Sequence, residues 1–140
     1  MKYDDASWHS GGQFPEGSPA EYGGTHIALL LKWCVLKGWA GQLHKGEGAT
    51  ALGQLMHGEI SATDFLFEFC DGKLTDEDLD DQGNAFVSVY YGDHGDYLND
   101  YADNFGELMY VASEGEHDFR LFSSMVDARY NAFVESQAGL

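Results

Sequence analysis

A nearly continuous apolar helix most constrains the fold of this chain. The run from Ile27 to Lys37 reads IALLLKWCVLK, and Lys32 is its one polar residue before the end. Thr25 is a suitable N-cap ahead of the run, and Gly38 is a suitable stop after it. Apolar side chains cover almost every face of this helix, so it cannot lie on a surface. The rest of the chain must therefore pack around it.

The remaining pattern predicts a mainly α-helical, compact single domain spanning residues 1–140. We expect a bundle of about five to six helices, because apolar residues recur at helical spacing between capping residues and glycines. Besides the apolar helix, the expected helices cover residues 49–57, 65–70, 97–105 and 117–137. Ser61 and Thr75 are expected to cap helical segments, of which the second is short and exposed, and Phe69 and Cys70 are expected to face the core. Helical spacing also favours a helix over residues 84–91. A short strand or hairpin near 86–91 and 108–112 is an alternative there, since β-branched and aromatic residues favour strands. Glycines and prolines predict an irregular entry segment over residues 1–24.

The strongest functional signal is an acidic and aromatic stretch from Asp71 to Asp103. Lys73 is its only cation among many carboxylates. The whole chain has 24 acidic and 7 basic residues and a formal net charge of −17 at pH 7. Such a charge repels nucleic acid and anionic membranes, and it speeds association with cationic proteins. We therefore expect a basic protein partner, with no nucleic acid and no membrane.

The predicted partner-binding residues combine carboxylates, which supply attraction and register, with tyrosines, which supply contact area. They are Asp76, Glu77, Asp78, Asp80, Asp81, Tyr90, Tyr91, Asp93, Asp96, Asp100 and Asp103. Tyr97, Tyr101 and Phe105 recur on the opposite face of the same predicted helix, so we expect them in the core.

Known metal and catalytic motifs do not fit. Asp76, Asp78 and Asp80 copy the first ligands of a calcium-binding EF-hand loop. However, Asp81 replaces the required turn glycine and Val87 replaces the final bidentate glutamate. The six histidines show no metal-ligand spacing, and no nucleophile motif is present. We expect no metal, no cofactor and no enzymatic activity.

The two cysteines, Cys34 and Cys70, each lie in an apolar helical pattern and not in a C-x-x-C pair. We expect both to be buried thiols without a disulfide or metal role. The N-terminus lacks the apolar core of a signal peptide. A membrane span needs about 18 apolar residues in a row, and no run in the sequence is that long. These features predict a cytoplasmic protein.

Two alternative functions stay open. Asp4, Asp5 and His9, with His26 at the head of the apolar helix, are residue types used by small enzymes and metal-dependent proteins. That hypothesis requires these residues to converge in one cleft. An acidic adaptor or nucleic-acid mimic would instead space its carboxylates like phosphates along one face.

Several segments resemble an uncharacterised family of small bacterial proteins, a domain of unknown function. The opening KYDDASWH of residues 2–9 is the most specific, followed by THI at 25–27, DGKLTDEDL at 71–79 and GNAF at 83–86. The resemblance extends to Tyr101 and implies no catalytic residues, because no activity is established for that family. Such small acidic proteins look like immunity proteins. The resemblance thus implies a protein that binds and neutralises a cognate bacterial toxin, secreted or polymorphic, by blocking its active site.

Overall fold

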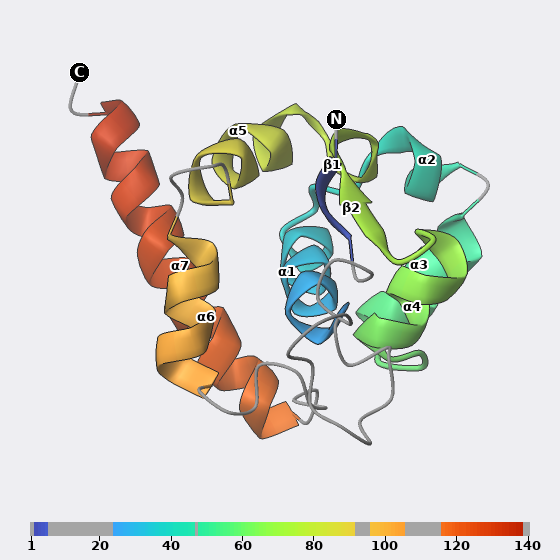
Figure 1. The fold of residues 1–140 in the computed structure, drawn as a ribbon. Coiled ribbons are helices and arrows are strands. Elements are labelled where there is room, and N and C mark those ends of the chain that lie inside the picture. Colours follow the sequence, from blue (N-terminus) through green and yellow to red (C-terminus); the bar gives the residue numbers. More distant parts are fainter. Residues whose placement is uncertain (1, 6–23, 47, 92–95, 106–115, 139–140) are drawn as a thin grey trace.

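Helix α1 (Thr25–Leu36) lies at the centre of the fold, with the other elements arranged around it (Figure 1). The computed structural model describes residues 2–5, 24–46, 48–91, 96–105 and 116–138. Ten of the 12 residues of α1 are buried, as its all-round apolar pattern predicts. The helix ends as expected, with Gly38 at a positive φ of 85°. Its N-cap is Gly24 and not Thr25, because Thr25 is already helical and its side chain is buried.

Three helices cover α1 on one side (Figure 1): α2 (Gln42–Lys45), α3 (Ala49–Met56) and α4 (Ala62–Phe69). The Ser61 hydroxyl oxygen accepts a hydrogen bond of 3.0 Å from the backbone N–H of Asp64, so the capping signal is confirmed. Helix α4 packs against α1 and buries Phe65 and Leu66. The helix predicted over residues 49–57 is confirmed as α3.

A two-stranded antiparallel sheet joins the N-terminus to the middle of the chain. Strand β1 (Lys2–Asp5) pairs with β2 (Lys73–Thr75), with Asp4 opposite Leu74 and Asp5 opposite Lys73. The prediction of an irregular segment was therefore wrong for residues 2–5. A strand this short has no local signature, and it forms only because its partner strand is brought alongside by the packing of α1 and α4.

The other side of α1 is covered by α5 (Asp81–Tyr90), α6 (Tyr97–Phe105) and α7 (Glu116–Ala138) (Figure 1). Residues 86–91 do not form a strand: residues 86–90 complete α5, as helical spacing indicated. The alternative at 108–112 lies outside the described residues. Tyr97 and Tyr101 are fully buried, as expected. Among the described residues, no helix combines the length and apolar character needed to cross a lipid bilayer.

An aromatic cluster joins α1 to α5 and α7. Trp33 of α1 contacts Trp39 edge-on with ring centroids 5.4 Å apart, and Tyr130 of α7 lies 5.0 Å from Trp39. Phe86 of α5 approaches Tyr130 at 5.3 Å and Trp33 at 5.6 Å. Aromatic pairs in such edge-to-face geometry contribute beyond their buried area. This cluster therefore holds α5 and α7 against α1 through apolar contacts.

Replacing Phe86 with alanine tests that cluster. Phe86→Ala leaves a cavity between three elements and should lower the free energy of unfolding by about 3–5 kcal/mol. Val89→Ala on the same helix, where the side chain is 62% exposed, should change it by less than about 0.5 kcal/mol. Urea denaturation followed by circular dichroism measures both. Equal losses for the two variants would contradict the role of the cluster.

Candidate functional site

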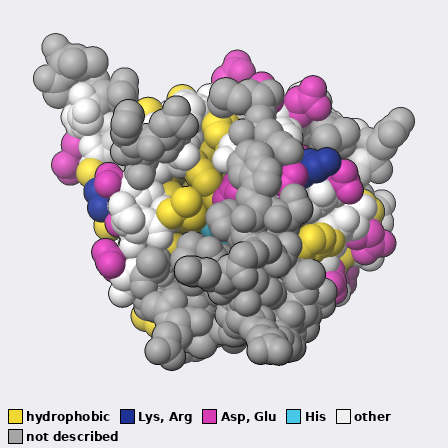
Figure 2. Space-filling view, in the orientation of Figure 1, with side chains coloured by type: hydrophobic (Ala, Val, Ile, Leu, Met, Phe, Trp, Pro, Cys, Tyr) yellow, Lys and Arg dark blue, Asp and Glu magenta, His cyan; other side chains and the backbone are white. Residues whose placement is uncertain are grey.

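The predicted partner-binding residues do not share one surface. Residues 76–80 lie in the connection between β2 and α5, and Asp81 is the first residue of α5. Asp96 precedes α6, and Asp103 belongs to it. In Figure 1, α6 and α7 lie on one side of α1 and α4 lies on the other. Acidic side chains accordingly stand in separate groups around the face shown in Figure 2. Glu77, Asp81, Asp96 and Asp103 are exposed. Asp93 lies outside the described residues.

Asp78 belongs to the interior and is not available to a partner, contrary to our expectation. Its side chain caps the 3₁₀ turn η3 (Asp76–Asp78): Oδ2 accepts hydrogen bonds from the Thr75 backbone N–H at 2.8 Å and from the Thr75 hydroxyl at 3.3 Å. Its other oxygen lies 2.8 Å from Nε2 of His44, which is also buried. The capping signal at Thr75 is thus confirmed, but Asp78 of this turn is buried and not exposed as we predicted.

Asp80 has a local structural role too. Its Oδ1 accepts a hydrogen bond of 2.9 Å from the backbone N–H of Gly83, so it is the N-cap of α5. Asn84 donates from Nδ2 to the backbone carbonyls of Asp76 and Leu79 at 2.8 and 3.2 Å. These bonds hold the acidic connection against the start of α5.

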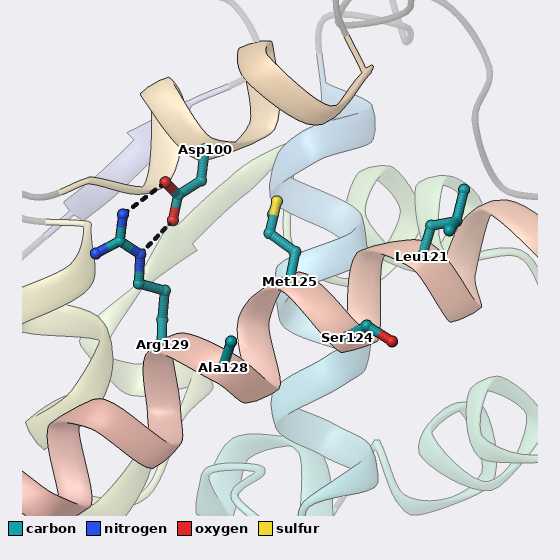
Figure 3. Close-up of a pocket in the computed structure, with 6 residues that line it drawn as sticks. All are labelled: Asp100, Leu121, Ser124, Met125, Ala128 and Arg129. Carbon is teal, nitrogen blue, oxygen red and sulfur yellow. Dashed lines mark hydrogen bonds and ion pairs between the residues drawn. The ribbon is translucent and has the colours of Figure 1, made fainter.

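Tyr90 and Asp100 form part of a network between α5, α6 and α7. Tyr90 is 4% exposed, so it cannot anchor a partner as predicted, and its hydroxyl donates to Asp100 Oδ2 at 2.7 Å. Arg129 binds the same carboxylate in a bidentate manner, at 2.7 Å from Nε and 2.9 Å from Nη2 (Figure 3). A second contact of 3.4 Å joins Arg129 to Asp96. Arg129 thus neutralises the acidic face of α6 in part.

This network shifts the acid–base properties of its members. Partial burial alone would raise the pKa of Asp100, but hydrogen bonds from Arg129 and Tyr90 and the arginine charge lower it below its ordinary value. Burial and the neighbouring Asp100 raise the pKa of the Tyr90 hydroxyl. A hollow of about 500 Å³ adjoins the ion pair and is lined mainly by α7, including Leu121 and Met125 (Figure 3). Among the described residues that line this hollow, the ionisable groups are the paired Asp100 and Arg129.

The N-terminal Asp/His cluster converges in part. His26 Nε2 lies 3.2 Å from Asp4 Oδ2, and both side chains are buried. Tyr91 of the acidic stretch donates its hydroxyl hydrogen to the same oxygen. The Asp5 backbone N–H donates to the other oxygen of Asp4 at 2.7 Å, and Asp5 is also buried. His9 lies outside the described residues.

An open hollow of about 370 Å³ lies where α4, β2 and η3 meet, and its walls are acidic and aromatic. The lining residues are Phe67, Glu68, Phe69, Cys70, Asp71, Lys73, Thr75, Glu77 and Asp78. Phe67 and Phe69 are 38% and 41% exposed. Lys73 pairs with Asp71 at 2.9 Å, so this cation is already neutralised. In this hollow of the described surface, exposed aromatics and carboxylates occur together around a concavity.

Sequence reasoning missed most of this hollow. It placed Phe69 and Cys70 in the core, but the last turn of α4 extends past the edge of the core, which leaves Phe69 exposed and Cys70 half-buried. One signal was present. Phe65, Phe67 and Phe69 are spaced by two, and residues two apart on a helix do not share a face. At least one of these phenylalanines therefore had to point away from α1.

Three polar side chains from distant segments meet beside the hollow. Cys70 Sγ lies 3.8 Å from His44 Nε2, and the same nitrogen contacts Asp78. Both cysteines are free thiols; Cys34 is buried, as expected, whereas Cys70 is half-buried. Burial and the nearby Asp78 raise the pKa of the Cys70 thiol. No short spacing motif links residues 44, 70 and 78, and only the fold brings them together.

A pH titration of stability tests the role of Asp100. A carboxyl with a lowered pKa stabilises the fold fully above its unfolded pKa of about 3.9, and this contribution is lost as pH falls through the folded-state value. Asp100→Asn should therefore lower the free energy of unfolding near neutral pH. It should also flatten the decline of that free energy below about pH 4. Chemical denaturation at a series of pH values gives both quantities. Asp103→Asn, an exposed change on the same helix, is the control, and indistinguishable pH profiles for the two variants would refute the assignment.

Comparisons with known proteins identify a family but no activity. No curated protein and no solved structure matches the chain significantly. A family described as a domain of unknown function, DUF7832, matches residues 2–114. The match covers all elements from β1 to α6 and ends before α7. The chain thus belongs to the DUF7832 family of domains of unknown function.

Proposed function

We propose that this chain is an immunity protein: a cytoplasmic, non-enzymatic binding protein that neutralises a cognate bacterial toxin by covering its basic active-site cleft. The observation that carries the proposal is the pair of exposed phenylalanines, Phe67 and Phe69, beside the carboxylates of Glu68, Asp71 and Glu77. Exposed aromatics grouped at a concavity are typical of surfaces that bind another protein.

The charge of the chain supports a cationic partner. A net charge of −17 steers a basic protein toward the domain from a distance. At contact, Glu68 and Glu77 would pair with lysines or arginines, and the phenylalanines would fill apolar pockets between them. This proposal moves the predicted interface toward α4 and keeps Glu77 from the original set. Asp81, Asp96 and Asp103 would then act mainly by long-range attraction.

The proposed mechanism needs no reaction by the chain itself. Catalytic clefts that act on anionic substrates are basic, so a carboxylate-rich surface competes for the same site. The decisive experiment is co-expression with the product of the neighbouring gene, followed by pull-down. Lack of toxicity of that product, or toxicity that persists when both are expressed, would overturn the proposal.

Alanine substitution at the aromatic pair tests where the partner binds. Phe67→Ala combined with Phe69→Ala should raise the Kd for the toxin at least about 30-fold, equivalent to about 2 kcal/mol, because buried aromatic anchors dominate binding energy. Met56→Ala, at an apolar residue of α3 that is 46% exposed, should leave the Kd within about twofold. Calorimetry or surface plasmon resonance measures both. Equal effects of the two changes would place the interface elsewhere.

Charge reversal at Glu68 and Glu77 distinguishes steering from anchoring. These changes should slow association and weaken its dependence on salt, with a smaller effect on dissociation. Glu135→Lys on α7 is the matched control, because Glu135 is exposed and does not line the hollow. Stopped-flow association rates at several ionic strengths provide the readout. Unchanged rates for the Glu68 and Glu77 variants would argue against this surface.

The approach of His26 to Asp4 favours one second candidate, a small enzyme or metal-dependent protein. A buried histidine beside a carboxylate is a frequent arrangement in acid–base chemistry. Reversal of Glu68 and Glu77 separates the two functions, because it should slow association with the toxin while leaving Asp4 and His26 untouched. The nucleic-acid mimic has less support, since Asp96 and Asp100 of the α6 region are paired with Arg129.

A further inference from the structure

We propose that His44, Cys70 and Asp78 form a binding site for a divalent transition metal of the zinc class. Their nearest ligand atoms, one nitrogen, one sulfur and one oxygen, all lie within 4.8 Å of one another. His44 and Asp78 are buried and Cys70 is half-buried. The site goes beyond the proposed toxin binding and does not depend on it, because it concerns the isolated chain.

The contact geometry favours a shared ligand over a catalytic relay. In a nucleophile–histidine–carboxylate relay, the two ring nitrogens of histidine face different partners. Here a single nitrogen, His44 Nε2, faces both Asp78 Oδ1 at 2.8 Å and Cys70 Sγ at 3.8 Å. Three donor atoms of different side chains gathered within 4.8 Å are the arrangement that a metal ion requires.

The two separations that involve the His44 nitrogen need only small adjustment to hold zinc. Tetrahedral zinc binds nitrogen and oxygen at about 2.0–2.2 Å and sulfur at about 2.3 Å, so its ligand atoms lie about 3.4–3.6 Å apart. The nitrogen–sulfur separation is close to that value. The nitrogen–oxygen hydrogen bond would lengthen by about 0.6 Å as the ion took its place.

The donor set and its charge select the metal. Calcium and magnesium prefer oxygen ligands, whereas a mixed set of imidazole, thiolate and carboxylate suits zinc and cobalt. Cys70 binds as the thiolate, and its proton passes to solvent. One thiolate and one carboxylate then balance the two positive charges of the ion, which avoids the cost of an uncompensated buried charge.

Backbone hydrogen bonds hold the three ligands in place. The N–H of Gly41, at the start of α2, donates to the carbonyl of Asp78 at 2.9 Å. A Cβ at Gly41 would lie 2.3 Å from the carbonyl oxygen of Glu77, so only glycine permits this approach. Thr75 orients the other oxygen of Asp78, as an outer-shell partner does in metal sites. Cys70 follows α4 as its C-cap and donates its N–H to Leu66.

The hollow supplies the route to solvent. Cys70 and Asp78 both line it, so an ion can enter there and can bind a water molecule as its fourth ligand. Three protein ligands with one open position are the arrangement of exchangeable zinc sites rather than closed structural ones.

Cobalt titration of the reduced full-length protein tests the proposal. Co²⁺ should bind one to one and produce a sulfur-to-cobalt charge-transfer band together with the visible bands of a four-coordinate centre, and Zn²⁺ should displace it. Cys70→Ser should abolish the charge-transfer band. Loss of an outer-shell partner typically weakens metal binding about 10- to 100-fold. His44→Gln and Asp78→Asn remove direct ligands and should therefore weaken Co²⁺ binding by more than that.

Matched controls keep the outcome clear if a variant folds poorly. Cys34→Ser removes the other thiol, which lies in the core, and His57→Gln removes an exposed histidine. Both should retain the full band, with far-ultraviolet circular dichroism confirming the fold of every variant. Absence of the band in the unmodified protein overturns the site without need of any variant. A band that survives Cys70→Ser, or is lost in Cys34→Ser, overturns the ligand assignment.

Discussion

The burial of α1 on all sides is the constraint on which the rest of the structure depends. A helix that buries ten of its 12 residues needs packing partners around its whole circumference. Helices α3 and α4 supply them on one side and α7 on the other, and β2 also contacts α1. Lys37, just past the helix, keeps its charged end at the surface, where it pairs with Asp127 at 3.3 Å. The apolar contacts of α1 thus determine where the elements that pack against it can lie.

The excess of acidic residues is used inside the protein as well as on its surface. Asp78 and Asp80 accept hydrogen bonds from backbone N–H groups at the starts of short helical segments. Asp127 accepts a hydrogen bond of 3.0 Å from the indole N–H of Trp33. Asp4 and Asp100 accept hydrogen bonds from tyrosine hydroxyls. A carboxylate offers several acceptor positions and no donor, so it suits places where several N–H and O–H groups converge. A high acid content therefore does not by itself mean an acidic binding surface.

The hollow beside α4 gains its properties from the junction of three elements. Helix α4 contributes exposed aromatics, β2 contributes a lysine already paired with Asp71, and η3 contributes Glu77 above a buried His44–Asp78 contact. Toxin binding and metal binding would use different depths of this one region. The phenylalanines and glutamates face solvent, whereas the nitrogen, sulfur and oxygen donors lie below them.

The sequence alone determined most of the helices, because helical spacing, capping residues and glycine stops are local signals that act within a few residues. It predicted the central position of α1, the caps at Ser61 and Thr75, and the burial of Tyr97 and Tyr101. Only the tertiary structure decided the β1–β2 pairing, the burial of Asp78 and Tyr90, and the meeting of His44 with Cys70. Each of these depends on contacts between segments far apart in the chain, and a single sequence carries no local pattern for such contacts.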